Sequence, residues 1–98
     1  MYTVKTLPEF DAWLGGLKDR MTKQRLSVRL RKAMLGNLGD VKPVGDGLFE
    51  MREHFGPGWR MYYLKRGDVL IVMLGGGDKS SQRKDVSAAK QRASMLED

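Results

Sequence analysis

The 98-residue sequence has no cysteine, a single histidine (His54) and no long run of apolar residues. The absence of cysteine excludes disulfides and thiolate chemistry, and it fits a reducing compartment. One histidine cannot form a pair of imidazoles acting as acid and base, nor a histidine-rich metal site. No segment approaches the roughly 18 apolar residues that span a bilayer, and the amino terminus lacks the apolar stretch of a signal peptide. We therefore expect a cytoplasmic protein that has no redox chemistry and no contact with a membrane.

The charges that are present are mostly positive. The formal net charge is +6 and the sequence pI is about 9.8, a balance that favours polyanionic partners such as nucleic acid. Residues 20–35 hold six cations and no acid, and residues 79–92 hold five cations against Asp85. The cations are therefore concentrated in two segments.

The amino-terminal half predicts one short strand and two helices. Residues 2–5 alternate like a strand. In "TLPE", Thr6 and Glu9 fit a capping box, and an apolar stripe at helical spacing follows. Thr22 fits the cap of a second helix, whose apolar face runs up to Gly39.

The carboxy-terminal half predicts three strands and a helix. "LFEMREH", "WRMYYLK" and "VLIVML" are joined by short turns, which favours an antiparallel meander. The last of these runs is apolar on both sides, so it should be a central strand covered by helices. A final helix should begin near Ser80 or Ser81. Residues 1–98 are thus expected to form one α+β domain, with two amino-terminal helices packed on a twisted antiparallel sheet of about four strands and a carboxy-terminal helix.

Three cations of the second helix follow one another at helical spacing. Arg25, Arg29 and Lys32 stand at i, i+4 and i+7, so they share a face and repel one another weakly. This face is either simply solvated or a docking surface for a polyanion.

A second group of cations lies on the predicted strands. Arg52 or His54 would lie close to Arg60 in an antiparallel pair. Such charges need solvent, a partner such as Glu50 or Glu53, or a bound anion.

The glycine cluster "GGGDKSS", residues 75–81, invites a phosphate-binding interpretation. It fails the P-loop template because Asp78, not a glycine, precedes Lys79. Two interpretations remain. The glycines form a turn for geometric reasons, or their N–H groups and the positive end of the following helix approach a phosphate.

A site built only from cations can still cleave RNA. The ribose 2′-OH attacks the adjacent phosphate, so the protein mainly orients the chain and stabilises the developing negative charge. Arginine suits this task through its planar fork, and Lys79, close in sequence to Arg83 and Lys84, is the candidate proton carrier.

The segments "LPEFDAWLGGLKD", "GLFEMRE", "GPGWRMYY" and "VLIVMLGGGDKSSQRKDV" resemble toxins of the RelE/ParE superfamily, in particular the HigB-like addiction module killer proteins. The resemblance covers almost the whole chain and implies the fold described above. It also implies an mRNA endonuclease that acts on the translating 70S ribosome without a metal or other cofactor. A cognate antitoxin, usually with a helix-turn-helix domain, would neutralise it.

Site residues follow from the same resemblance. Arg52, Arg60 and Lys79 match the catalytic positions, with Arg60 as phosphate stabiliser and Lys79 as loop cation or proton carrier. The RNA-binding positions are Arg25, Arg29, Lys32, His54, Gln82, Arg83 and Lys84.

Two alternatives stay open. Several relatives use a carboxy-terminal tyrosine or histidine in catalysis, and residues 75–98 contain neither, so the general acid is not assigned; Gln82, Arg83 and Lys84 substitute only in part. ParE-like members of the superfamily inhibit DNA gyrase instead of cleaving RNA, and a non-catalytic nucleic-acid-binding domain is a further alternative.

Overall fold

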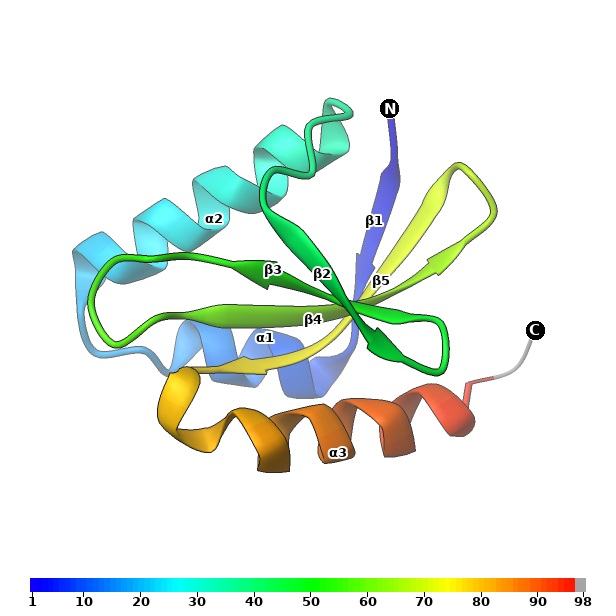
Figure 1. Cartoon of the computed structure of the whole chain (residues 1–98). Coiled ribbons are helices and arrows are strands. Elements are labelled where there is room, and N and C mark those ends of the chain that lie inside the picture. Colours follow the sequence, from blue (N-terminus) through cyan, green and yellow to red (C-terminus); the bar gives the residue numbers. More distant parts are fainter. Residues whose placement is uncertain (97–98) are drawn as a thin grey trace.

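The computed structural model describes residues 1–96, in which a five-stranded sheet carries helices on both faces (Figure 1). The elements in chain order are β1 (Thr3–Thr6), α1 (Pro8–Gly15), α2 (Arg20–Met34), β2 (Val41–Gly45), β3 (Leu48–Arg52), β4 (Arg60–Arg66), β5 (Leu70–Gly77), the 3-10 turn η1 (Lys79–Ser81) and α3 (Gln82–Ser94). The α+β class predicted from the sequence is confirmed.

The sheet differs from the expected one in two respects. Its strand order is β1-β5-β4-β3-β2, and β1 runs parallel to β5, whereas all other neighbours are antiparallel. The prediction of a wholly antiparallel sheet of about four strands was therefore wrong in detail. Four residues carry a pattern too short to reveal the partner or the direction of β1.

The strand that the sequence analysis missed is β2. Pro43 and Gly45 lower its strand propensity, but β2 lies at the edge of the sheet, where proline is tolerated. Asp46 and Gly47 join β2 to β3 with φ values of 55° and 77°. An Asp-Gly pair with two positive φ angles is typical of a tight hairpin, so this dipeptide was the available signal.

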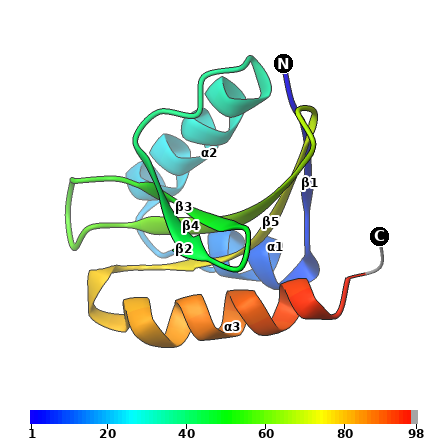
Figure 2. The same ribbon diagram turned by 45° about the vertical axis from the view of Figure 1, so that its right-hand side comes forward.

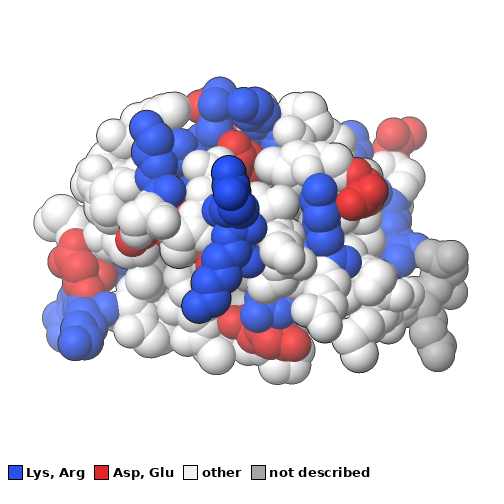
Figure 3. All heavy atoms as spheres, turned by 60° about the horizontal axis from the view of Figure 1, so that its bottom comes forward, with Lys and Arg blue, Asp and Glu red and all other residues white. Residues whose placement is uncertain are grey.

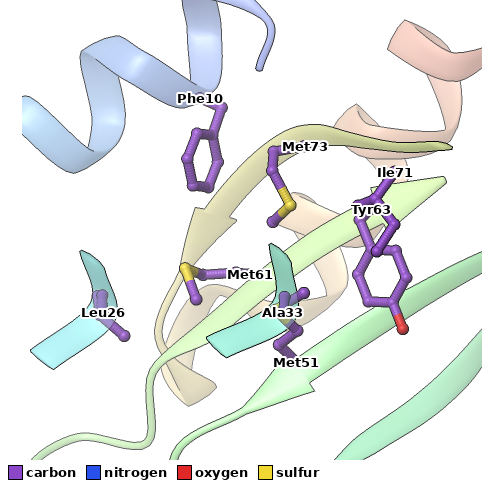
Figure 4. Packing of buried hydrophobic residues seen from close by; sticks show 8 residues of the cluster. All are labelled: Phe10, Leu26, Ala33, Met51, Met61, Tyr63, Ile71 and Met73. Atoms are coloured by element: carbon purple, nitrogen blue, oxygen red, sulfur yellow. The ribbon is translucent and has the colours of Figure 1, made fainter. Parts of the chain in front are cut away.

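Helices cover the two faces of the sheet separately (Figure 2). Met61, Tyr63, Ile71 and Met73 belong to a core cluster that also contains Phe10 of α1 (Figure 4). That cluster includes Leu26 and Ala33 of α2 as well. Side chains of β4 and β5 on the opposite face belong to a second cluster. It consists of Leu48 of β3, Tyr62 of β4, Val72 and Leu74 of β5, and Ala89 of α3. The expectation that the last apolar run is covered on both sides is confirmed.

The helix boundaries correct two capping predictions. α1 begins at Pro8, after the cap residue Leu7, and no side chain caps it, so the capping box of Thr6 and Glu9 does not form. α2 is capped by Asp19, whose carboxylate accepts hydrogen bonds from the Thr22 amide at 3.3 Å and the Thr22 hydroxyl at 2.6 Å. These bonds lower the pKa of Asp19. α2 also ends at Met34, well before Gly39.

The start of α3 agrees with the sequence analysis. Its first residue is Gln82, and Ser81 is the residue before it. A serine near position 80 or 81 was expected there.

Candidate active site

Four residues form a row across one end of the sheet. The Arg52 amide donates to the Asp40 carbonyl at 2.9 Å, Arg52 lies opposite Arg60, and Arg60 lies opposite Gly77. Because side chains alternate along a strand, the row faces the same side as Leu48, on which α3 packs. Arg52 or His54 was expected close to Arg60, and the register places Arg52 opposite it.

Arg60 is the buried member of this row. Its side chain lies beneath the surface, with the residue 7% exposed, and Nη1 donates to the carbonyls of Glu53 at 3.2 Å and Trp59 at 3.0 Å. Nε lies 4.0 Å from the Glu50 carboxylate and has no hydrogen-bond partner. Arg60 therefore holds the β3–β4 loop through Nη1, and its Nε–H is a buried donor without a hydrogen-bond partner.

A layer of buried polar groups lies beside Arg60, under the first turn of α3. Glu50 is 2% exposed, and Gln82 Nε2 donates to its carboxylate at 2.9 Å. The Tyr62 hydroxyl has no hydrogen-bond partner. Burial, followed by the nearby carboxylates of Glu50 and Asp85, raises the pKa of Tyr62 well above its ordinary value. The polar layer ties the amino-terminal end of α3 to the sheet.

Asp40 joins two of the expected functional residues. One carboxylate oxygen lies 3.0 Å from Arg52 Nη2 and the other 2.7 Å from His54 Nε2. The hydrogen bond from His54, followed by that from Arg52, lowers the pKa of Asp40 to about 2. Asp40 thus carries a negative charge at neutral pH and holds the side chains of both Arg52 and His54.

Lys79 lies on the exposed turn between β5 and α3. Asp78 caps this turn by accepting a 2.8 Å hydrogen bond from the Ser80 amide, and hydrogen bonds from Ser80 lower the pKa of Asp78. The Lys79 amide donates to the Pro57 carbonyl at 3.4 Å. A side chain at Gly58 would meet both Lys79 and Arg60, which places the Lys79 stem beside the buried arginine.

The glycine cluster does not form the expected turn. Gly75, Gly76 and Gly77 belong to β5. An added Cβ would collide with Arg92 at Gly75, with Trp13 at Gly76 and with Asp85 at Gly77. The chain's own side chains therefore occupy the space that a phosphate would need at these glycines.

Arg29 was expected on an exposed basic face, and this expectation was wrong. Its guanidinium donates to the carbonyls of Leu38, Asp40 and Arg52 and to the Glu53 carboxylate, at 2.7 to 3.2 Å. Arg29 is 8% exposed. The signal for its burial was that Leu26 and Ala33, at i−3 and i+4, put Arg29 on the core side of α2.

Arg25 and Lys32 are exposed, as expected, and line a cavity beside α2. The cavity measures about 390 Å³, and its other lining residues include Gln24, Val28 and Glu53. The Arg25 guanidinium lies 3.8 Å from the centre of the Phe55 ring. This basic surface belongs to α2, which packs on the sheet face opposite α3.

Arg83 and Lys84 are exposed on the first turn of α3. The face formed by α3 carries lysines and arginines as separate groups, with acidic side chains among them (Figure 3). Apart from Arg83 and Lys84, the predicted site residues fall into two sets. Arg52, His54, Arg60, Lys79 and Gln82 gather around the row, whereas Arg25, Arg29 and Lys32 belong to α2.

Sequence reasoning missed Asp40 altogether, because the adjacent strand β2 was not recognised. It named Glu50 only as a possible partner of the strand cations, which agrees with the 4.0 Å approach to Arg60. Within residues 1–96, no cluster of three or more His, Asp or Glu side chains that could bind a metal is present. No helix in this part of the chain is long and apolar enough to cross a membrane.

Comparison with known proteins identifies a relative. No family model matches the sequence. An uncharacterized protein of Haemophilus influenzae is 43% identical over 93 residues, which cover 95% of this chain and 94% of that protein. The chain belongs to the same family as this protein. Its likeness to the Haemophilus relative extends across both α2 and the Asp40–Gly77 row, since nearly the whole chain is matched.

A solved structure has a fold similar to that of this chain. The solution structure of the conserved hypothetical protein HP0894 from Helicobacter pylori matches 82% of this chain and 97% of its own, with a TM-score of 0.52. The sequence identity is 20%, so this likeness concerns the fold alone.

Proposed function

We propose that the protein is the toxin of a type II toxin–antitoxin module and a ribosome-dependent mRNA endonuclease that needs no metal. In this proposal a cognate antitoxin with a helix-turn-helix domain neutralises it in the cytoplasm. The observation that carries the proposal is the gathering of Arg52, Arg60 and Lys79 at one end of the sheet. The sequence resemblance to RelE/ParE toxins rests on the segments that contain these residues.

The chemistry assigns different tasks to the three cations. The 2′-oxygen of the ribose attacks the adjacent phosphorus, and the bond from phosphorus to the 5′-oxygen breaks, which leaves a 2′,3′-cyclic phosphate and a 5′-hydroxyl. Arg52 and Lys79 carry the accessible positive charge that stabilises the pentavalent phosphate. Arg60 contributes its positive charge from below the protein surface, because it is buried and its Nη1 is already bonded to the loop carbonyls.

The burial of Arg60 also favours a second candidate. In a ParE-like inhibitor of DNA gyrase, Arg60 would be a structural residue and the exposed cations a docking face. The two hydrogen bonds from Arg60 to the backbone fit that role as well. A gyrase supercoiling assay with the purified protein separates the candidates, because an endonuclease leaves supercoiling unchanged.

Lys79 offers a cleaner test than Arg60, because it is exposed and its loss leaves no buried group unpaired. Purified protein is mixed with 70S ribosomes that carry a synthetic mRNA, and cleavage is followed by primer extension. We expect the wild type to cut within the coding region and Lys79→Ala to cut about 100-fold more slowly, the cost of losing one group that stabilises a transition state.

Lys5→Ala is the matched control, because it removes one exposed charge from β1, a strand at the opposite edge of the sheet from β2. Its cleavage rate should equal that of the wild type. Equal rates for Lys79→Ala and the wild type would contradict the assigned role of Lys79. Absence of cleavage by the wild type would contradict the proposed function itself.

A further inference from the structure

We propose that His54, held by Asp40, is the group that accepts the ribose proton in the cleavage reaction. This inference rests on the proposed function. It assigns the proton-transfer role to the β3–β4 loop instead of to the carboxy-terminal segment, where residues 75–98 offer neither tyrosine nor histidine.

The contact between Asp40 and His54 shows which nitrogen of the imidazole carries a proton. An ionised carboxylate only accepts hydrogen bonds, so the 2.7 Å contact requires the proton on Nε2 of His54. The lone pair of a neutral ring is then on Nδ1. The side chain of His54 is 69% exposed, which leaves it accessible to a substrate. A carboxylate that holds one nitrogen of an imidazole and leaves the other free is the arrangement that general base catalysis needs.

The loop that carries His54 is tied to the two cations of the proposed site. Arg60 Nη1 donates to the carbonyl of Glu53, the residue before His54. The Lys79 amide donates to the carbonyl of Pro57 in the same loop. Because the Arg60 side chain and the Lys79 backbone amide both bond to one loop of seven residues, 53–59, His54 is held at the same end of the sheet as Arg60 and Lys79.

A second set of contacts holds Asp40. Arg29 Nη2 donates to the Asp40 carbonyl at 2.7 Å, and Arg29 Nη1 binds the Glu53 carboxylate at 3.0 Å. Arg29 is buried and thus links both segments from beneath. Asp40 and Arg29 are positioning residues, since they hold His54 and Arg52 in place and take no part in the proton transfer themselves.

The tyrosines of the sheet cannot act as the general base in place of His54. Tyr62 and Tyr63 are 0% and 1% exposed and lie within the two core clusters. A substrate hydroxyl cannot reach either phenol without unfolding the core.

The step conserves atoms and charge. Nδ1 of His54 takes the proton of the 2′-hydroxyl as the 2′-oxygen forms its bond to phosphorus. The bond from phosphorus to the 5′-oxygen breaks, and the Lys79 ammonium donates a proton to the departing oxygen. Both side chains return to their starting states by exchange with water.

The test measures cleavage of ribosome-bound mRNA under single-turnover conditions, with the wild type, His54→Ala and Asp40→Asn. We expect His54→Ala to lower the rate constant at saturating protein about 100-fold or more, the usual contribution of a general base. Added imidazole should restore part of that rate constant for His54→Ala and have no such effect on Asp40→Asn, which keeps its histidine. Asp11→Asn, at an exposed position of α1, is the control for loss of a carboxylate.

The outcomes separate this inference from the function on which it rests. If the wild type cleaves and His54→Ala cleaves at the same saturating rate, the inference is overturned while the proposed function stands. A weaker affinity with an unchanged saturating rate also overturns it, because His54 would then only bind RNA. A reduced rate that imidazole does not raise contradicts it as well. If the wild type does not cleave at all, the proposed function fails and the inference fails with it.

Discussion

Among single residues, the cations of the candidate site differ most in burial. Arg29 and Arg60 are buried and bind backbone carbonyls, whereas Lys79 is exposed. The sequence placed Arg52 near Arg60 correctly from strand alternation alone. It could not separate buried from exposed cations, because an arginine that binds three carbonyls looks the same in a helical pattern as one that faces water. The flanking apolar residues at helical spacing were the only sign for Arg29.

Among the glycines, Gly77 leaves the least room for a side chain, because a Cβ there would collide with the Asp85 carboxylate. Gly77→Ala should therefore lower the free energy of unfolding by about 1 to 3 kcal/mol, the usual cost of overpacking. Urea unfolding measures the change. Gly15→Ala is the control, because nothing lies within 4 Å of its Cβ position, and alanine in a helix should leave stability equal or slightly higher. Equal unfolding midpoints for Gly77→Ala and the wild type would contradict the predicted overpacking, because the first turn of α3 would then shift at little cost in free energy.

A second prediction at this scale concerns Asp40 and pH. Its pKa is lowered from 3.8 to about 2 in the folded protein. A lowered pKa means that the stabilisation is fully present above the unfolded value and is lost as pH falls through the folded value. The stability difference between the wild type and Asp40→Asn should thus be constant near neutral pH and shrink between about pH 4 and pH 2. A difference that stays constant down to pH 2 would contradict the ion pairs of Asp40.

Among the elements, the edge strand β2 limited what the sequence could predict. The three strands β3, β4 and β5 and the start of α3 were recognised from alternation and a serine cap. Pro43 and the glycines around it concealed β2, and with it the place of Asp40 beside Arg52 and His54. The parallel pairing of β1 was equally hidden, because a direction of pairing is set by the path of the whole chain and not by four residues.

Arg29 links α2 to the segments around β2 and β3, so its removal should affect several elements together. Arg29→Ala removes the side-chain donor of the Glu53 carboxylate and of the Leu38 and Arg52 carbonyls, and one of the two donors of the Asp40 carbonyl. The expected loss of unfolding free energy is about 3 to 5 kcal/mol, as for breaking a buried ion pair. Arg31→Ala, an exposed cation of the same helix, should change stability by less than about 0.5 kcal/mol. Similar losses in the two variants would contradict the linking role of Arg29.

In the molecule as a whole, both faces of the sheet are covered by helices (Figure 1), and Arg52, Arg60 and Gly77 lie in register at one end of it. The net charge is +6, and on the face drawn in Figure 3 the lysines and arginines form separate groups with acidic side chains among them. Attraction to RNA should therefore be general and sensitive to salt, whereas cleavage should depend on the few residues at the end of the sheet. Composition alone predicts the general attraction to RNA. The residues on which cleavage should depend could be grouped only once the register of the strands was known.

The measurement that tests the central claim most directly is a map of new 5′ ends in cellular mRNA within minutes of induction. Cells express the wild type, Lys79→Ala or Lys5→Ala from a tightly controlled promoter. The proposed endonuclease predicts cuts in phase with codons for the wild type and Lys5→Ala, and their loss for Lys79→Ala. Growth arrest with intact messages would contradict the endonuclease and favour inhibition of gyrase.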